Sequence, residues 1–437
     1  MTAPFDLSLL PRSSRVDDRG RLSIGDCDLE ELADEFGTPL VVYDEGELRA
    51  RAREYHEWFP GGAAYASKAF LCTAMARLVH EEGLHLDVAT GGELHVALRA
   101  GFPVERIVFH GNNKSDDELR RALVVGVGRI AVDSFDEIDR IERLVADGAP
   151  APAVHVRVTP GVEAHTHEFI ETGTEDSKFG FSLERGAALS AACRVVASPA
   201  MRFAGIHCHI GSQVFRLDSF ERAVDRMVEL IGAIEREASV VVDEINLGGG
   251  LGVRYLSTDV APSIAEYARG VHDAVRDALA RARVASTPRL MTEPGRSIAG
   301  PAGLTLYRVG TIKEIPGVRT YVAVDGGMSD NLRPVTYGAR YEAFVPARAT
   351  APRDLVATVA GKHCEQGDLL VRDAHLPTDL VVGDVIATPG TGAYGVAMAS
   401  NYNKVTRPAV VFVHGGIARV VVRRETLDDL LSHDVDA

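Results

Sequence analysis

Several residues with reactive side chains follow directly on short apolar stretches of this sequence. Lys68 ends the stretch GAAYASK, where its neighbours are small or apolar. Moving an ammonium group out of water lowers its pKa, and the Lys68 amine would then be available as a nucleophile or as a Schiff-base former. Taken alone, Lys68 would more simply be interpreted as a lysine at a strand end that reaches solvent. Its chemistry therefore has to be judged together with that of the other residues.

Two histidines lie two positions apart in the stretch FAGIHCHIGSQ. On a strand, this spacing puts His207 and His209 on one face and Cys208 on the other. A metal site would need a third and usually a fourth ligand, whereas the neighbouring stretches supply residues that suit a cofactor. We therefore predict no metal ion here. His209, as the outermost residue, would lay its ring against a cofactor, and His207 would lie one layer deeper in the core.

A run of three glycines, residues 248–250, allows backbone amides to approach an anion, as a phosphate site requires. Tight turns also use glycine, so this run is a weak signal by itself. Ser212 and the backbone amides of Gly295 and Arg296 would converge on the same rim. A lysine for a Schiff base, a phosphate cradle and the acid Glu293 in TEPGR together predict a pyridoxal phosphate site.

A repeated pattern of strands and helices would position these residues. From residue 61 to residue 296, short β-branched runs alternate with longer amphipathic segments. Eight strand-then-helix units in about 250 residues are the size of a closed (β/α)8 barrel, whose chemistry lies at the carboxyl ends of the strands. Asp87, His110 and Asn112 also fall at these ends. The predicted strands are GAAYASK, LHLDVAT, RIVFHG, RIAVDS, AVHVRVTP, FAGIHCHIG, EINLGGG and RLMTEPG.

A second region begins after residue 300, where the helical pattern stops. Stretches such as GLTLYRVGTIKEI, RTYVAVDGG and ARVVVRRE read as strands separated by Gly and Pro turns. The stretch RLSIGD near the amino terminus is also strand-like and could join them. We therefore predict an α/β fold with a (β/α)8 barrel over residues 38–299 and a discontinuous all-β domain over residues 1–37 and 300–437.

The composition narrows the classes of function. The formal net charge is −15, from 47 Lys and Arg against 62 Asp and Glu, which argues against a nucleic acid or an anionic membrane as partner. The five cysteines include no C-x-x-C pair, the first residues do not resemble a signal peptide, and no apolar run approaches the roughly 18 residues of a membrane span. We expect a soluble cytoplasmic protein with free thiols.

Nine motifs place the chain beside a known family. The chain contains, in order, YASKAF, HGNNKS, HEFIETGTEDSKFGF, HCHIGSQ, LGGGLGVRY, EPGRSI, DNLRPVTYGARY, GKHCEQGD and GAYGVAMASNYN. In these motifs it resembles the diaminopimelate decarboxylases, pyridoxal-phosphate enzymes of the alanine-racemase-like barrel class. The resemblance covers almost the whole chain. It implies the decarboxylation of meso-2,6-diaminopimelate to L-lysine and CO₂, the last step of lysine biosynthesis.

The resemblance implies a role for each residue of the predicted cofactor site. Lys68 would hold pyridoxal phosphate covalently, His209 would stack on its ring, and Glu293 would pair with the pyridine nitrogen. A protonated ring nitrogen withdraws electrons and stabilises the carbanion that remains when CO₂ departs. Asp87 would lie close to Lys68. The implied phosphate contacts are Ser212, Gly249, Gly250, the amides of Gly295 and Arg296, and Tyr394.

The resemblance also implies how substrate is recognised. Arg296 and Arg333 would bind the distal carboxylate, since such a group on an acidic protein needs forked, charge-assisted donors. Glu365 would bind the ammonium group at the reacting centre, and Cys364 would deliver a proton to the carbanion. The implied substrate contacts are Arg296, Arg333, Tyr337, Glu365 and Tyr394.

The cysteine segment carries a further expectation. In the family this segment reaches the active site of the neighbouring subunit, so we expect an obligate homodimer with shared active sites. The chain departs from the family at Gln366, where a serine usually stands. Because Gln366 adjoins Cys364 and Glu365, the change could alter how substrate is positioned.

Other classes of function stay open. A decarboxylase of the same fold could act on ornithine, lysine or arginine, but these substrates lack the distal carboxylate that Arg333 and Tyr337 would bind. A racemase of this fold would tend to have an arginine in place of Glu293. A catalytically silent pyridoxal-phosphate-binding homologue could lose Lys68 or Cys364 without penalty, yet both are present.

Overall fold

The computed structural model describes residues 4–162 and 177–435. Most of the motif HEFIETGTEDSKFGF, residues 167–176, lies outside them. The chain divides into two compact units. The barrel unit contains Arg51–Gly252 and Ala261–Ser297, and the sheet unit contains Met1–Ala50, Val253–Val260 and Ile298–Ala437.

The barrel unit is built on a parallel sheet whose first and last strands meet at a bridge between Ala63 and Thr292. Closure joins the first and last strands, because Thr292 N donates to Gly62 O and Ala64 N donates to Thr292 O, both at 2.9 Å. The predicted (β/α)8 barrel is confirmed, with each of the eight predicted stretches forming a strand. In sheet order the strands are β5 (Ala64–Ala66), β6 (His85–Val88), β7 (Ile107–Phe109), β8 (Arg129–Val132), β9 (Ala153–Thr159), β11 (Arg202–Cys208), β12 (Glu244–Asn246) and β13 (Arg289–Met291), with β10 (Phe181–Ser182) beside β9.

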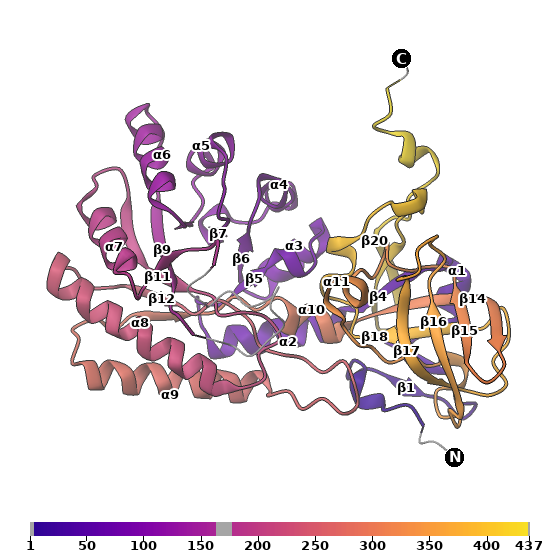
Figure 1. The fold of residues 1–437 in the computed structure, drawn as a ribbon. Helices are drawn as coiled ribbons and strands as arrows, with labels where there is room; N and C mark the ends of the chain where they lie inside the picture. The colour runs from indigo at the N-terminus through magenta and orange to yellow at the C-terminus, as the bar shows by residue number, and fades with distance from the viewer. Residues whose placement is uncertain (1–3, 163–176, 436–437) are drawn as a thin grey trace. The chain divides into compact units, whose positions relative to one another are not determined.

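Helices surround this sheet (Figure 1). Ser115 begins one of them with a capping box, in which its side chain and that of Glu118 satisfy each other's backbone amides. Apolar residues at spacings of three bury one face of the next helix, as at Ile138, Ile141 and Leu144. The helices are α3 (Thr73–Glu81), α4 (Gly91–Ala100), α5 (Asp116–Val125), α6 (Phe135–Ala146), α7 (Ala187–Ala197), α8 (Leu217–Ala238) and α9 (Ile264–Ala282), while α2 (Glu45–Trp58) and α10 (Arg296–Ala302) run from one unit into the other.

A charged cluster lies at the amino ends of the barrel strands. Glu244, the first residue of β12, accepts hydrogen bonds from Arg129 Nη2 and His155 Nε2, both at 2.6 Å, and from Arg289. Burial raises the pKa of the Glu244 carboxyl, but the hydrogen bonds and charges of Arg129 and His155 outweigh burial and hold the pKa far below its usual range. The cluster therefore stays charged at the end of the barrel away from the predicted site.

The sheet unit contains an eight-stranded sheet and a small three-stranded one. Apolar residues of both pack into one core, which includes Leu22 and Ile24 of the predicted RLSIGD strand. The large sheet runs β17 (Leu369–Leu376), β16 (Leu355–Ala360), β15 (Arg319–Val324), β14 (Gly303–Ile315), β4 (Leu40–Asp44), β19 (Ala409–His414) and β20 (Ile417–Val422), with β18 (Val385–Pro389) also on β14. The small sheet is β1 (Arg15–Val16), β2 (Leu22–Ile24) and β3 (Cys27–Asp28), and the helices are α1 (Leu29–Phe36) and α11 (Arg333–Tyr337).

The division between the units differs from the sequence-based boundaries. A boundary at residue 38 groups β4 with the barrel, whereas β4 pairs with β14 and β19 in the sheet unit. All five residues of β4 are buried, so the strand needs partners on both edges and cover on both faces. Residues 253–260 also belong to the sheet unit although barrel residues flank them.

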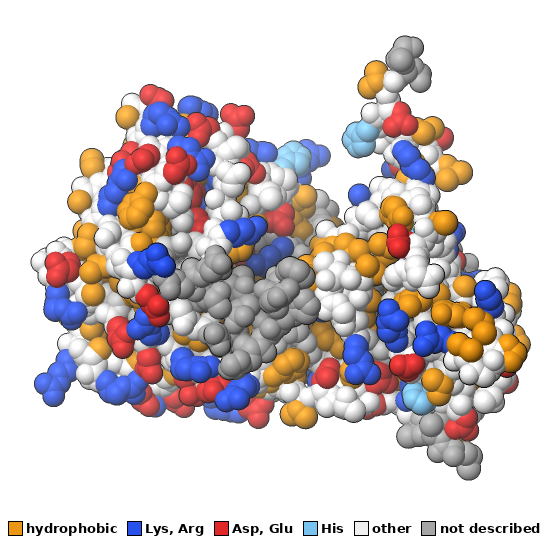
Figure 2. Space-filling model, in the orientation of Figure 1, with side chains coloured by type: hydrophobic (Ala, Val, Ile, Leu, Met, Phe, Trp, Pro, Cys, Tyr) orange, Lys and Arg blue, Asp and Glu red, His pale blue; other side chains and the backbone are white. Residues whose placement is uncertain are grey.

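The surface bears mixed charge. On the face drawn in Figure 2, acidic and basic side chains are interspersed over the helices of the barrel unit. Within residues 4–162 and 177–435, no helix combines the length and the apolar character needed to cross a membrane.

Candidate active site

Glu293, just after β13, is the centre of a buried hydrogen-bond network at the carboxyl ends of the strands. Its Oε1 accepts a hydrogen bond from Asn246 Nδ2 at 2.7 Å and lies 2.8 Å from His110 Nε2, and its Oε2 lies 3.0 Å from His207 Nε2. Burial raises the pKa of Glu293, but the positive charge of His110 and the hydrogen bonds from His110 and His207 outweigh burial and hold the pKa well below its usual range. Glu293 is therefore an ionised acceptor inside the barrel.

The two histidines of this network differ in charge. His207 on β11 is 1% exposed, and burial lowers its pKa to about 3, so its ring is neutral and donates through Nε2 to Glu293. Burial also acts to lower the pKa of His110, but Glu293 and Asp87 raise it above the ordinary value. Each carboxylate oxygen of Glu293 thus lies within hydrogen-bonding distance of the Nε2 atom of one histidine ring.

Asp87 and Lys68 lie on the neighbouring strand ends. Asp87 is on β6, and its Oδ1 lies 4.0 Å from His110 Nε2. Burial raises the pKa of Asp87 to about 6, while the charges of His110 and Lys68 act to lower it. Lys68 follows β5 in a single turn, Ser67–Ala69, with its side chain exposed and both neighbours buried. Its exposure differs from the desolvated amine that the apolar stretch around it suggested.

His209 lies just beyond the end of β11 and is only half-buried. Its Nδ1 accepts a hydrogen bond from the backbone amide of Gly249 at 3.1 Å, which fixes the ring at the rim. Burial and the nearby positive charges of Lys68 and Arg157 hold the pKa of His209 well below its ordinary value, so the ring is neutral. A neutral, flat ring held at the rim is suited to lie against an aromatic cofactor.

The rim also gathers donors that suit a phosphate. Arg296 donates from Nη2 to Ser212 Oγ at 2.8 Å and from Nε at 3.2 Å. A Cβ added to Gly249 would lie 2.2 Å from Glu293 O, and one added to Gly250 would lie 2.5 Å from the carbonyl oxygen of the glycine after Ile210. Only glycine permits such a close approach of the backbone at these two positions. The loops after β11, β12 and β13 can therefore pack tightly enough for their backbone amides to approach one anion.

Gly295 completes this cradle. A Cβ at Gly295 would approach the Cβ atoms of Ala66 and Ala69 to 3.0 and 3.1 Å, so a side chain there would push against the turn that bears Lys68. The barrel unit thus brings together an amine, an ionised acid, a neutral ring and a set of phosphate donors. This set fits pyridoxal phosphate: the amine suits its aldehyde, the acid its ring nitrogen, the flat ring its pyridine face, and the donors its phosphate.

Arg333, Tyr337 and Tyr394 lie in the sheet unit. Arg333 opens α11 and is 5% exposed, and its guanidinium carbon lies 4.6 Å from the ring centre of Tyr255 and 5.5 Å from that of Tyr341. Its Nη1 donates to the Tyr341 hydroxyl. Tyr337 ends α11 and is half-buried, as is Tyr394, whose backbone is left-handed with φ of 61°. Arg333 is therefore a buried cation fixed by two tyrosines, and not a residue of an exposed surface turn.

Cys364 and Glu365 are both exposed on a loop of the sheet unit. The base of this loop is tied down by Asp368, whose Oδ2 lies 2.7 Å from His363 Nδ1 and whose Oδ1 accepts a hydrogen bond from Met328 N at 2.7 Å. The backbone amide of Cys364 donates to Asn403 Oδ1 at 2.9 Å. The thiol is thus presented to solvent on a backbone that is fixed from both sides.

Sequence reasoning gave no role to three buried residues of the barrel mouth. Asn246, which holds Glu293, ends the strand stretch EIN, where a polar residue in an apolar run is the signal. Lys114 of HGNNKS donates to Gly111 O, Ala131 O and Glu137 Oε1 at 2.6–2.9 Å and locks the loop that follows His110. Arg157 on β9 is 8% exposed, and its positive charge acts with that of Lys68 to lower the pKa of His209.

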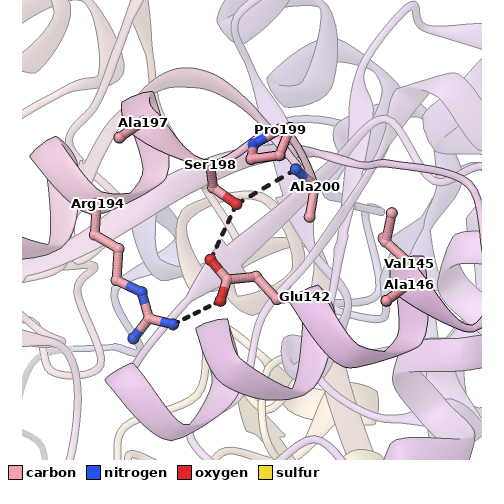
Figure 3. A pocket seen from close by; sticks show the side chains of 8 residues that line it. All are labelled: Glu142, Val145, Ala146, Arg194, Ala197, Ser198, Pro199 and Ala200. Atoms are coloured by element: carbon pink, nitrogen blue, oxygen red, sulfur yellow. Dashed lines mark hydrogen bonds and ion pairs between the residues drawn. The ribbon is translucent and has the colours of Figure 1, made fainter.

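A surface pocket of about 580 Å³ lies on the helices of the barrel unit, away from these residues (Figure 3). Glu142 of α6 is bound there by Arg194 Nη2 at 2.7 Å and by Ser198 Oγ at 3.0 Å. Its charged groups therefore already neutralise one another, and the remaining lining is mainly alanine, valine and proline.

The fold and these donors define a class, the pyridoxal-phosphate enzymes built on a (β/α)8 barrel. In agreement, residues 45–300 match the family model described as pyridoxal-dependent decarboxylase, pyridoxal binding domain. The chain is 49% identical over 435 residues to the diaminopimelate decarboxylase of Mycobacterium tuberculosis, and 47% identical over 428 residues to that of Bacillus subtilis, with 97% of both chains covered each time.

A comparison with solved structures agrees with these sequence matches. The crystal structure of diaminopimelate decarboxylase from M. jannaschii in complex with L-lysine matches with a TM-score of 0.89 at 32% identity, covering 98% of both chains. The chain therefore belongs to the diaminopimelate decarboxylase family, which confirms the resemblance found in its motifs.

Proposed function

We propose that this protein decarboxylates meso-2,6-diaminopimelate to L-lysine and CO₂ with pyridoxal phosphate as cofactor, the last step of lysine biosynthesis, in the cytoplasm. One observation carries the proposal. The match to diaminopimelate decarboxylases extends over 97% of both chains, so it includes the sheet unit with Arg333 and Cys364 as well as the cofactor barrel.

The barrel residues divide the work of holding the cofactor. Lys68 binds it covalently and His209 lies against its ring. Its phosphate is bound by Ser212, Gly249, Gly250, the backbone amides of Gly295 and Arg296, and Tyr394. When bound, pyridoxal phosphate withdraws electrons from the amino acid so that the bond to CO₂ can break. Glu293 accepts the hydrogen bond of the ring nitrogen, because its low pKa keeps it ionised.

Residues of the sheet unit then select and protonate the substrate. The guanidinium of Arg333 is held by the Tyr255 ring and by the Tyr341 hydroxyl, and is therefore pre-oriented to bind a carboxylate. Arg296, Tyr337 and Tyr394 also contact the substrate, and Glu365 binds the ammonium group at the reacting centre. Cys364 Sγ donates the proton that replaces CO₂ on the α-carbon.

The assembly is a homodimer whose active sites are shared. The exposure of Cys364 and Glu365 on a rigidly tied loop supports this proposal, because a catalytic thiol offered to solvent on one subunit can serve a site on another. Gln366 on the same loop is exposed as well and would lie beside the bound substrate.

The test is direct. Purified protein is incubated with pyridoxal phosphate and meso-diaminopimelate while CO₂ and lysine are measured, with lysine and ornithine as parallel substrates. We expect turnover of diaminopimelate alone, and an absorption band of lysine-bound cofactor that Lys68→Ala abolishes. A band without turnover of diaminopimelate would overturn the substrate and retain the cofactor site. Turnover of ornithine or lysine would indicate the related decarboxylase activity instead.

A further inference from the structure

We propose that His110 is a positioning residue for the reaction: it lies between the Glu293 and Asp87 carboxylates and carries the positive charge that keeps Glu293 an acceptor toward the cofactor's ring nitrogen. This inference rests on the proposed function, and it assigns to His110 a task different from that of His207, although both rings contact the same carboxylate.

Geometry separates the two histidines. His207 Nε2 is 3.0 Å from Glu293 Oε2, and within the described residues His207 Nδ1 has no hydrogen-bond partner. A buried ring with one donor in use and one bare nitrogen is best accommodated as a neutral ring. His207 therefore contributes a hydrogen bond to Glu293 and no charge.

His110 is surrounded by charges of both signs. Glu293 Oε1, following β13, lies 2.8 Å from its Nε2, and Asp87 Oδ1, on β6, lies 4.0 Å from the same nitrogen. The neutral ring of His207 on β11 lies 4.7 Å away between ring centres, and Arg157 on β9 adds one opposing positive charge. The two carboxylates outweigh the single opposing cation, so the proton stays on His110.

Removing that charge has a specific consequence. Asp87 and Glu293 would then face each other as two buried carboxylates without the cation between them, and like charges in such a site cannot both remain ionised. One of them takes up a proton near neutral pH. Asp87, whose pKa burial raises to about 6, and Glu293 then share that proton, and a Glu293 carboxyl group that holds it no longer accepts the hydrogen bond of the ring nitrogen. Asn246, which also holds Oε1, supplies orientation but no charge.

The test uses two glutamine variants. Glutamine keeps an N–H donor near the position of Nε2 but cannot be protonated, so His110→Gln removes a charge whereas His207→Gln removes only a neutral ring. For each holoenzyme, the pH dependence of the cofactor's absorption band and of kcat/KM is measured. We expect His110→Gln to move the acid limb of both profiles upward by about one pH unit or more. His207→Gln lowers activity but leaves the acid limb in place.

A second measurement needs neither turnover nor cofactor. In the apoenzyme, NMR titration of histidine ring protons should show the His110 signal, identified by its loss in His110→Gln, titrating above the unperturbed value of about 6.5. Asp87→Asn, which removes one facing carboxylate, should lower that midpoint even if the His110 variant folds poorly. A His110 midpoint below 6.5, or equal limb shifts in the two glutamine variants, would overturn the proposal. If the protein does not turn over diaminopimelate, the proposed function is wrong, but the titrations still test the charge of His110.

Discussion

The charged cluster at the amino ends of the barrel strands gives a quantitative prediction about stability. Glu244→Gln keeps the size of the side chain but removes the charge, and its NH₂ group would then face a guanidinium. Glu244 is only 4% exposed and receives hydrogen bonds from Arg129, His155 and Arg289. His155 is buried, but Arg129 and Arg289 are partly exposed, so the loss of these charged hydrogen bonds costs about 1.5–3 kcal/mol. With a urea m-value of about 3 kcal/mol/M, the unfolding midpoint should fall by about 0.5–1 M.

The assay is urea unfolding at pH 7, followed by the fluorescence of Trp58, which is the one tryptophan of the sequence and lies in the barrel unit. The Nε2 atom of His272 on α9 lies 2.9 Å from the backbone oxygen of Trp58. The fluorescence of Trp58 therefore reports on the packing of the barrel unit. Glu229→Gln is the matched control, because Glu229 is exposed and its ion pair with Arg226 at 3.5 Å is worth about 0–1 kcal/mol.

The pH dependence of this effect has a definite sign. The pKa of Glu244 is lowered on folding, so its contribution to stability is complete above the unfolded value of about 4.3 and is lost as the pH falls toward the folded pKa. The difference between wild type and Glu244→Gln should therefore be full at pH 7 and narrow below about pH 4. Equal midpoints for Glu244→Gln and Glu229→Gln at pH 7 would refute the reasoning.

Three further predictions concern the proposed active site. Arg333→Lys loses the forked pair of donors, and with it about 1.5–3 kcal/mol of binding free energy to the substrate carboxylate. In steady-state assays kcat/KM for diaminopimelate should fall roughly tenfold to hundredfold, and an unchanged KM would contradict the role of Arg333. Cys364→Ser should lower kcat far more than KM, because the thiol is proposed to donate a proton in the chemical step. If active sites are shared, mixing inactive Lys68→Ala and Cys364→Ala subunits under exchange should restore about a quarter of wild-type activity, whereas separate sites would restore none.

Much of the fold could be predicted because the signals are local. Each barrel strand has its own apolar stretch and each helix its own period and cap, so the count of eight units and the barrel itself followed from neighbours along the chain. β4 shows the limit. Its five buried residues predict an inner strand but do not indicate which sheet it belongs to. That choice depends on partners such as β14, which are far away in sequence.

The sequence by itself determined where the candidate site residues gather, since Lys68, Ser212, Glu293 and the glycine run 248–250 stand at strand ends, and the strand ends of a parallel barrel must meet. Only the tertiary structure decided their electrostatic state. Glu293 is ionised because His110, 183 residues earlier in the chain, comes within 2.8 Å of it, and Lys68 is exposed despite apolar neighbours in sequence. A pKa depends on charges and burial in space, and no local pattern of residues contains that information.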